Sequence, residues 1–224
     1  LGADLKQKTG DGSSRIITIS PDPKANLLPR FGEKVTDNGT GLPISGSNFV
    51  YLYKGPAFSA GLISDKDFSS GQTGTFEADD WSDKATYGQQ FYKLGEEGDW
   101  TEIDYGGQNG WFYNPGGANS IDSKGQLVKS VGSKDIPIYG CAYPDNQILD
   151  KSQVSGVVST PIYQIKPGRK YVYGGTVRGD YFNSHFASAE DGSVIQGPKE
   201  YYQMQFNHRI AFIKASDAEL NSRT

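Results

Sequence analysis

The chain has 224 residues and a formal net charge of −4, which counts against nucleic-acid binding, because Lys and Arg must neutralise phosphates there. Apolar residues form 35% of the chain and aromatic residues 12%, enough for one large or two small hydrophobic cores. The 29 glycines and 14 tyrosines beside one methionine favour turns and sheets over helices, and no run approaches the ~20 apolar residues of a membrane helix.

Residues 1–48 are expected to form an extended N-terminal segment with one strand. Residues 1–14 are polar and contain no apolar run of a signal peptide, so the chain is either a trimmed fragment of an exported protein or a cytoplasmic protein. The strand is RIITI at 15–19, and prolines and glycines mark the residues after it as loop. The sequence leaves open whether this strand adds to a later sheet or belongs to a preceding domain.

The segment 87–115 has a clear strand pattern. Apolar and polar residues alternate and glycines interrupt the alternation, which predicts three short antiparallel strands joined by tight turns. Together with a strand at 49–53 it predicts a small barrel over residues 49–116, with Trp100 and Trp111 in its core and therefore outside any binding site.

The same pattern recurs between residues 135 and 220, which predicts an internal repeat and a second small barrel. The aligned segments, none of which needs a gap, are 50–53 with 136–139, 87–91 with 167–171, 100–105 with 201–206, and Trp111 with Phe212. The small and polar run 117–134 is the predicted linker between the two barrels. The fold class is therefore all-β, with two tandem antiparallel barrels that carry long loop insertions.

Several short phrases resemble a known kind of domain. They are a strand followed by Gly55-Pro56, Gly88 before a strand, Gly98-Asp99-Trp100, and Gly110-Trp111. This pattern resembles the bacterial SH3-like domain, which secreted cell-wall enzymes carry outside their catalytic domain, although residues 60–85 replace a loop that is usually short in that family.

More particularly, residues 49–220 are similar to the C-terminal, non-catalytic region of N-acetylmuramoyl-L-alanine amidases secreted by actinobacteria. The resemblance implies SH3-like barrels, secretion, association with the cell wall, and peptidoglycan as the partner. It also implies that the zinc-dependent catalytic domain of such enzymes would precede this region and is not in the chain.

Exposed aromatic side chains are the residues from which we expect ligand binding, because sugar rings and short peptides pack on aromatic faces. The candidates in the first barrel are Tyr51, Tyr53, Tyr92, Tyr105 and Tyr113, and those in the second are Tyr139, Tyr143, Tyr173, Tyr181 and Tyr202. The competing interpretation of each tyrosine is a core or half-buried strand residue.

The sequence contains few residues that could form a catalytic or metal-binding site. Cys141 is the only cysteine, and His185 and His208 are the only histidines that could activate it. Two histidines fall short of a zinc site, and the acidic loops 65–67 and 79–83 do not follow a calcium-loop pattern. We therefore expect no catalytic residue, no metal and no cofactor.

The favoured hypothesis is a non-catalytic region of a secreted amidase-like protein, which binds peptidoglycan through its stem peptide or cross-bridge. Two other hypotheses stay open. One is a structural module that joins protein partners in an extracellular assembly or inhibits an enzyme. The other is a hydrolase that uses Cys141 or a pair of carboxylates.

Overall fold

The computed structural model confirms the all-β fold class. It describes residues 14–28, 42–43, 48–63, 84–142, 161–178, 181–182, 194–195, 200–207 and 209–221. Within these residues the only helical turns are three short 3-10 turns, η1 (Phe58–Ala60), η3 (Pro115–Gly117) and η4 (Ala215–Asp217). No helix in this part of the chain is long and apolar enough to cross a membrane.

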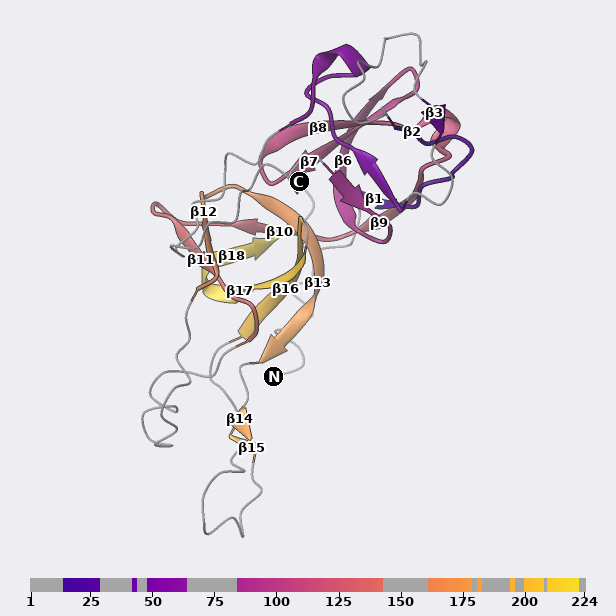
Figure 1. Cartoon of the computed structure of the whole chain (residues 1–224). Coiled ribbons are helices and arrows are strands. Elements are labelled where there is room, and N and C mark those ends of the chain that lie inside the picture. Colours follow the sequence, from indigo (N-terminus) through magenta and orange to yellow (C-terminus); the bar gives the residue numbers. More distant parts are fainter. Residues whose placement is uncertain are drawn as a thin grey trace.

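Two antiparallel five-stranded sheets form the body of the molecule, one coloured indigo to magenta and the other red to yellow in Figure 1. The first contains β1 (Ser14–Ile19), β6 (Gln90–Glu97), β7 (Trp100–Tyr105), β8 (Gln108–Tyr113) and β9 (Ser120–Gly125). The second contains β10 (Leu127–Ser130), β13 (Lys170–Arg178), β16 (Glu200–Phe206), β17 (Arg209–Lys214) and β18 (Ala218–Leu220).

The two sheets have the same topology. Their strand orders are β8-β7-β6-β1-β9 and β17-β16-β13-β10-β18, so each sheet follows the order fourth, third, second, first, fifth. A 3-10 turn separates the fourth strand from the fifth in both. An identical order over ten strands is strong evidence for the internal repeat that the sequence predicts.

Hydrogen-bond register supports the repeat residue by residue. An isolated bridge pairs Tyr53 with Trp111 in the first module, and another pairs Tyr139 with Phe212 in the second. The two bridges are equivalent, because the sequence alignment matches Tyr53 with Tyr139 and Trp111 with Phe212. Each second strand also has a register shift at the same place, between Lys93 and Gly95 in β6 and between Tyr173 and Gly175 in β13.

The expected domain boundaries are wrong in two places. Residues 1–48 were expected to precede the first module, but β1 pairs with both β6 and β9 and is therefore a central strand of the first sheet. The expected linker 117–134 contains β9 and β10, the last strand of the first sheet and the first of the second. The two modules follow one another with Gln126 alone between these strands.

Each module also contains a pair of short antiparallel strands, which we call its hairpin although a long connection joins the two strands. These hairpins are β4 (Phe49–Tyr51) with β5 (Lys84–Thr86), and β11 (Ile136–Ile138) with β12 (Tyr163–Ile165). Two further pairs are β2 (Leu27–Leu28) with β3 (Leu42–Pro43) and β14 (Tyr181–Phe182) with β15 (Val194–Ile195). The ladders of the described strands do not close into a barrel, so the expected tandem barrels are not confirmed.

Each hairpin packs on the inner face of its sheet and completes a hydrophobic core. In the first module Val50 and Leu52 are buried with Ile17, Phe91 and Ile103. The second module has the equivalent set, listed in the same order: Ile136, Ile138, Val128, Tyr171 and Met204. Burial of alternate residues in these strands follows from the two-residue side-chain period of a sheet that is covered on one face.

A third, smaller core joins the two modules. It consists of the buried Ile16, Leu127 and Val172, with Tyr92 packed against it. Ile16 and Tyr92 are cross-strand partners in the first sheet, and Leu127 and Val172 are cross-strand partners in the second. The residues that meet are therefore equivalent positions of the two repeats, as at a twofold dimer interface.

Polar contacts around this junction have the same symmetry. Gln89 Nε2 donates a 2.6 Å hydrogen bond to the backbone oxygen of Asn207, at the hairpin tip of the second module. Arg169, which aligns with Gln89, lies against Gly107 at the hairpin tip of the first module, where an added Cβ would be 1.7 Å from Arg169 Nη1. Lys170 Nζ also lies 5.7 Å from the ring centroid of Tyr92.

We predict that Leu127→Ala destabilises both modules together, by about 2–4 kcal/mol in the free energy of unfolding, because it opens a cavity in the small core between them. Urea unfolding followed by tryptophan fluorescence and far-UV circular dichroism measures this. Leu94→Ala, at the exposed bulge of β6, is the matched control and should change stability by less than about 0.5 kcal/mol. Two separate unfolding transitions in the unmodified protein would contradict the prediction.

Candidate functional site

Aromatic side chains gather on the outer face of the first sheet, the face directed away from its main core. In β7 the side chains of Thr101, Ile103 and Tyr105 are buried on the inner face, so alternation places Trp100, Glu102 and Asp104 on the outer face. Their partners in β8 are Tyr113 opposite Trp100, Trp111 opposite Glu102, and Asn109 opposite Asp104. We call this surface the first outer face.

Three buried rings support the first outer face. Tyr53, Phe58 and Trp100 are 3%, 6% and 8% exposed. Their ring centroids are 4.8–5.7 Å apart in edge-on arrangements, which are the favoured geometry for aromatic pairs. The residues that complete the cluster, Tyr51, Leu62, Trp111 and Tyr113, are partly buried. Part of each of these side chains therefore reaches solvent from a rigid base.

Local backbone features bring these rings together from three segments. The 3-10 turn η1 brings Phe58 against Tyr113, with ring centroids 5.1 Å apart. Two backbone hydrogen bonds between Tyr53 and Trp111, of 2.6 and 2.9 Å, attach the segment that follows β4 to the edge strand β8. The rings are therefore fixed by main-chain pairing as well as by packing.

Carboxylates and an amide lie beside the rings. Glu102 Oε1 accepts a 2.6 Å hydrogen bond from Asn109 Nδ2, and Asp104 Oδ1 accepts one of 2.8 Å from the backbone N–H of Gly107. At the other end, Lys84 Nζ lies 5.3 Å from the ring centroid of Tyr51. The surface thus combines aromatic faces with oriented polar groups, as ligand sites commonly do.

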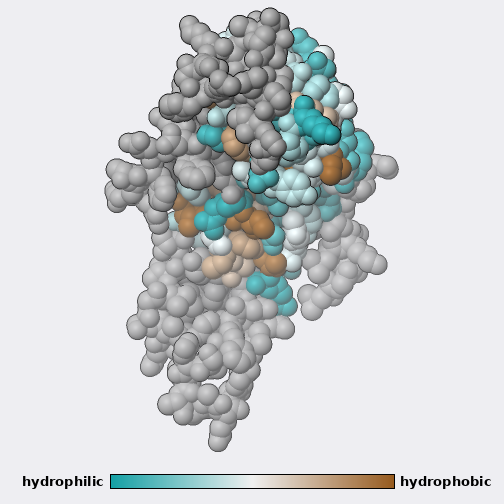
Figure 2. Space-filling view, turned by 45° about the vertical axis from the view of Figure 1, so that its right-hand side comes forward, coloured by the Kyte–Doolittle hydropathy of each residue, from teal (hydrophilic) through white to brown (hydrophobic). Residues whose placement is uncertain are grey.

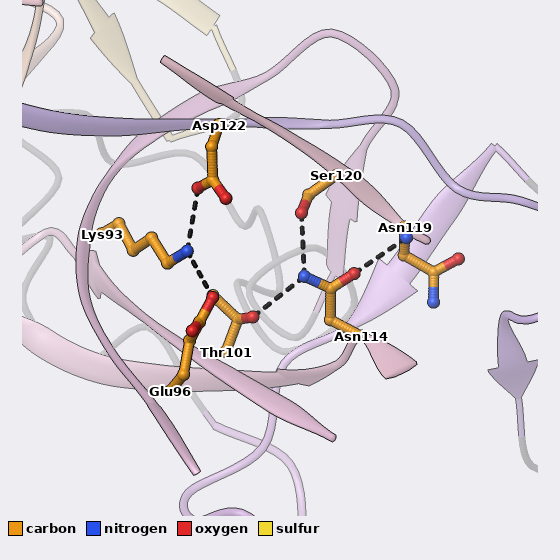
Figure 3. A network of polar contacts seen from close by, with 7 residues as sticks. All are labelled: Lys93, Glu96, Thr101, Asn114, Asn119, Ser120 and Asp122. Carbon is orange, nitrogen blue, oxygen red and sulfur yellow. Dashed lines mark hydrogen bonds and ion pairs between the residues drawn. The ribbon is translucent and has the colours of Figure 1, made fainter. Parts of the chain in front are cut away.

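A buried amide network holds Tyr113 in place. Asn114 Nδ2 donates to Thr101 Oγ1 at 2.9 Å and to Ser120 Oγ at 2.8 Å, and Asn114 Oδ1 accepts from the backbone N–H of Asn119 (Figure 3). Asn119 Nδ2 in turn donates to the backbone oxygen of Tyr113 at 2.8 Å. Both asparagines are buried, so their hydrogen bonds fix the turn between β8 and β9.

Lys93 forms the second polar cluster in Figure 3. Its side chain is 8% exposed, and Nζ donates to Glu96 at 2.5 Å and to Asp122 at 2.9 Å. Burial alone would lower the pKa of Lys93, but the hydrogen bonds and charges of the two carboxylates outweigh it and raise the pKa. The ammonium is therefore held in its charged form and links β6 to β9.

The second sheet has an equivalent face, which we call the second outer face. Tyr139 and Tyr201, which align with Tyr53 and Trp100, are edge-on with ring centroids 5.9 Å apart. The corresponding Tyr53–Trp100 pair is 5.3 Å apart in the same orientation. Lys214 takes the position of Tyr113, and its Nζ lies 5.3 Å from the ring centroid of Tyr139.

The ten tyrosines expected in the site do not form one surface. Four are buried, namely Tyr53, Tyr105, Tyr139 and Tyr202. Four are half-buried, namely Tyr51, Tyr92, Tyr113 and Tyr173, and of these Tyr92 lies at the junction between the modules. Tyr143 and the side chain of Tyr181 lie outside the described residues. Tyr51, Tyr53 and Tyr113 are the candidates that the structure brings together in the first outer face.

Trp111 and Phe58 belong to the first outer face but were not expected there. Trp100 is buried as predicted, whereas Trp111 is half-buried on the outer face, which corrects its assignment to the core. The sequence contained a signal for Trp111. Neighbouring residues of a strand lie on opposite faces, and Phe112 is fully buried on the inner face, so Trp111 lies on the outer face. Phe58 follows Gly-Pro in a non-strand segment and gave no periodic signal.

The residues considered for catalysis give no assembled site where the structure describes them. Cys141 is exposed. His185, His208 and the acidic loops 65–67 and 79–83 lie outside the described residues. Among the described residues, no group of three or more His, Cys, Asp or Glu side chains could hold a metal ion.

Large apolar side chains are sparse on the described surface. Tyr87, Leu94, Ile121 and Ile210 are the exposed examples in the described ranges. In the face drawn in Figure 2, hydrophobic residues lie in separate patches among hydrophilic ones. The first outer face differs from these separate residues, because its partly buried Tyr51, Trp111 and Tyr113 pack on one aromatic cluster.

No protein-family model, curated protein or solved structure matches this chain.

We predict that Asn114→Ala lowers the free energy of unfolding by about 2–3 kcal/mol, because it leaves a buried N–H without a partner and removes three hydrogen bonds. Urea denaturation measures the loss. Asn109→Ala is the control, since its amide is exposed and bonds to Glu102 at the surface, and should cost less than about 0.5 kcal/mol. Equal effects of the two substitutions would contradict the role of the Asn114 network.

Tyr113 provides a pH-dependent prediction. Burial and the negative charge of Asp99 raise its pKa above the ordinary value of 10.0. Because the folded protein favours the neutral phenol, this contribution to stability is fully present below about pH 10 and is lost as pH rises through the raised pKa. Asp99→Asn should lower the pKa of Tyr113 towards 10.0, as measured by the difference in tyrosinate absorbance between each protein and its Tyr113→Phe counterpart. An unchanged midpoint would show that Asp99 does not act on this phenol.

Proposed function

We propose that this chain is a non-catalytic binding region of a secreted, cell-wall-associated protein, and that it binds peptidoglycan through the first outer face. The observation that carries the proposal is a set of partly exposed rings, Tyr51, Trp111 and Tyr113, on the buried base of Tyr53, Phe58 and Trp100. Rigid aromatic surfaces contribute contact area at low cost in conformational entropy.

Sugar rings and short peptides both present apolar faces that pack on such a surface, while hydrogen bonds give the ligand its direction. Glu102 and Asn109 can supply those hydrogen bonds, because Glu102 is opposite Trp111 in the β7–β8 ladder. The hydrogen bond from the Asn109 amide to the Glu102 carboxylate keeps both groups beside the ring. The sequence resemblance to the non-catalytic region of secreted amidases supports peptidoglycan as the polymer. The proposal assigns no reaction to this region.

Trp111→Ala is the substitution that tests the proposal. It removes the half-buried indole from the edge strand and keeps the backbone hydrogen bonds with Tyr53, so we expect binding to purified Gram-positive sacculi to weaken by about tenfold or more. Co-sedimentation with sacculi over a range of protein concentrations measures the change.

Phe212→Ala is the matched control, because Phe212 has the same bridge position in the second module. Its binding should remain within about twofold of the unmodified protein. Thermal unfolding of both variants establishes that each is folded at the assay temperature. The proposal fails if the unmodified protein stays in the supernatant with sacculi from several Gram-positive species.

A further inference from the structure

The repeat allows the two outer faces to be compared position by position. The equivalent side chains are Trp100 and Tyr201, Glu102 and Gln203, Asp104 and Gln205, Asn109 and Ile210, Trp111 and Phe212, and Tyr113 and Lys214. The aromatic character is kept at the first and fifth of these positions. The charge is not kept.

Two carboxylates of the first face are amides in the second. Glu102 corresponds to Gln203, which has the same shape without the negative charge, and Asp104 corresponds to Gln205, which is neutral and one methylene longer. At the position of Tyr113 the second face carries the positive charge of Lys214. The folds are the same, so folding itself does not require carboxylates at these two positions.

The carboxylate of Glu102 is open to a ligand. Its described contact is the hydrogen bond from Asn109, which is a neutral donor, and within the described residues it forms no ion pair. Its partner in β6 is Gly95, which has no side chain to cover it, and its partner in β8 is Trp111. An added Cβ on Gly95 would lie 3.6 Å from Glu102 Oε2, so the carboxylate of this half-buried side chain extends over a position without a side chain. A negative charge is therefore fixed beside an aromatic ring.

The second outer face contains an ammonium group beside an aromatic ring. The ammonium of Lys214 lies 5.3 Å from the ring centroid of Tyr139, within the range of a cation–π contact. Tyr139 is the equivalent of Tyr53, and at the position of Lys214 the first face has a neutral phenol instead of a lysine. Lys84 lies at the other end, over Tyr51. The second face is thus supplied with an ammonium by its own chain, whereas no lysine or arginine of the described ranges forms an ion pair with Glu102.

We propose that the first outer face recognises the free amino group of a diamino acid in a cell-wall peptide. The ammonium binds to the carboxylate of Glu102, and the carbon chain of the same residue packs on Trp111. Charge complementarity identifies this occupant, because a carboxylate beside an aromatic ring suits an ammonium group. The second face keeps the ring as Phe212 but has the neutral Gln203 in place of the carboxylate. This inference rests on the proposed function, and it adds the chemical group of the peptide that is bound and the two side chains that bind it.

The test compares native sacculi with sacculi whose amino groups have been N-acetylated, which removes the positive charge and keeps the polymer. We expect acetylation to weaken binding of the unmodified protein by about tenfold. Glu102→Gln, which gives the first face the residue of the second, should bind native sacculi about tenfold more weakly and should no longer distinguish native from acetylated sacculi. Glu219→Gln, which neutralises an exposed carboxylate of β18 in the second module, is the control and should behave like the unmodified protein.

The outcomes separate this inference from the proposed function. If the unmodified protein binds both preparations equally and Glu102→Gln has no effect, the ammonium site is wrong while peptidoglycan binding stands. If neither preparation is bound, the proposed function fails and the inference with it. A Glu102→Gln protein that binds weakly but still prefers native sacculi would place the ammonium contact elsewhere and overturn the assignment to Glu102.

Discussion

Adjacent residues of one strand in each module point into different cores, and the whole structure depends on this. Ile17 of β1 is buried in the first module's core, while its neighbour Ile16 is buried at the junction. In β10, Val128 and Leu127 do the same for the second module. Since side chains alternate across a strand, a shift of one residue in either register would exchange the two sets and disrupt three cores at once. The first strand of each module, β1 or β10, therefore contributes both to the core of its own module and to the junction between the modules.

Duplication has kept the scaffold and changed the surface. The inner faces carry matching apolar residues because packing restricts them, whereas the outer faces differ in charge at Glu102 and Gln203 and at Tyr113 and Lys214. Ring pairs with the same edge-on geometry remain beneath both surfaces. A rigid junction then holds two surfaces of unlike charge on one molecule, so a polymer in contact with both would meet two different chemical environments.

Local patterns in the sequence predicted the all-β class and the repeat register, including the pairs of Tyr53 with Tyr139 and Trp111 with Phe212. They predicted the strand at 15–19 but not its place in the first sheet, and they assigned the residues of β10 to a linker. The reason is distance along the chain: β6, which pairs with β1, and β13, which pairs with β10, begin about 40 to 75 residues later. The site was predicted only in part. A tyrosine in a strand has the same local pattern on either face, so Tyr105 and Tyr113 looked alike until the ladders placed one inside and one outside.

The junction between the modules has a consequence for a single repeat. Its contacts join equivalent positions of the two copies: Ile16 with Leu127 across one small core, and Gln89 and Arg169 each directed at the opposite hairpin tip. A surface that pairs with its own relative in this way is self-complementary. An isolated copy would leave that surface bare in water and would tend to associate with a second copy. The tandem chain supplies the partner covalently, which replaces a concentration-dependent homodimer with a permanent one.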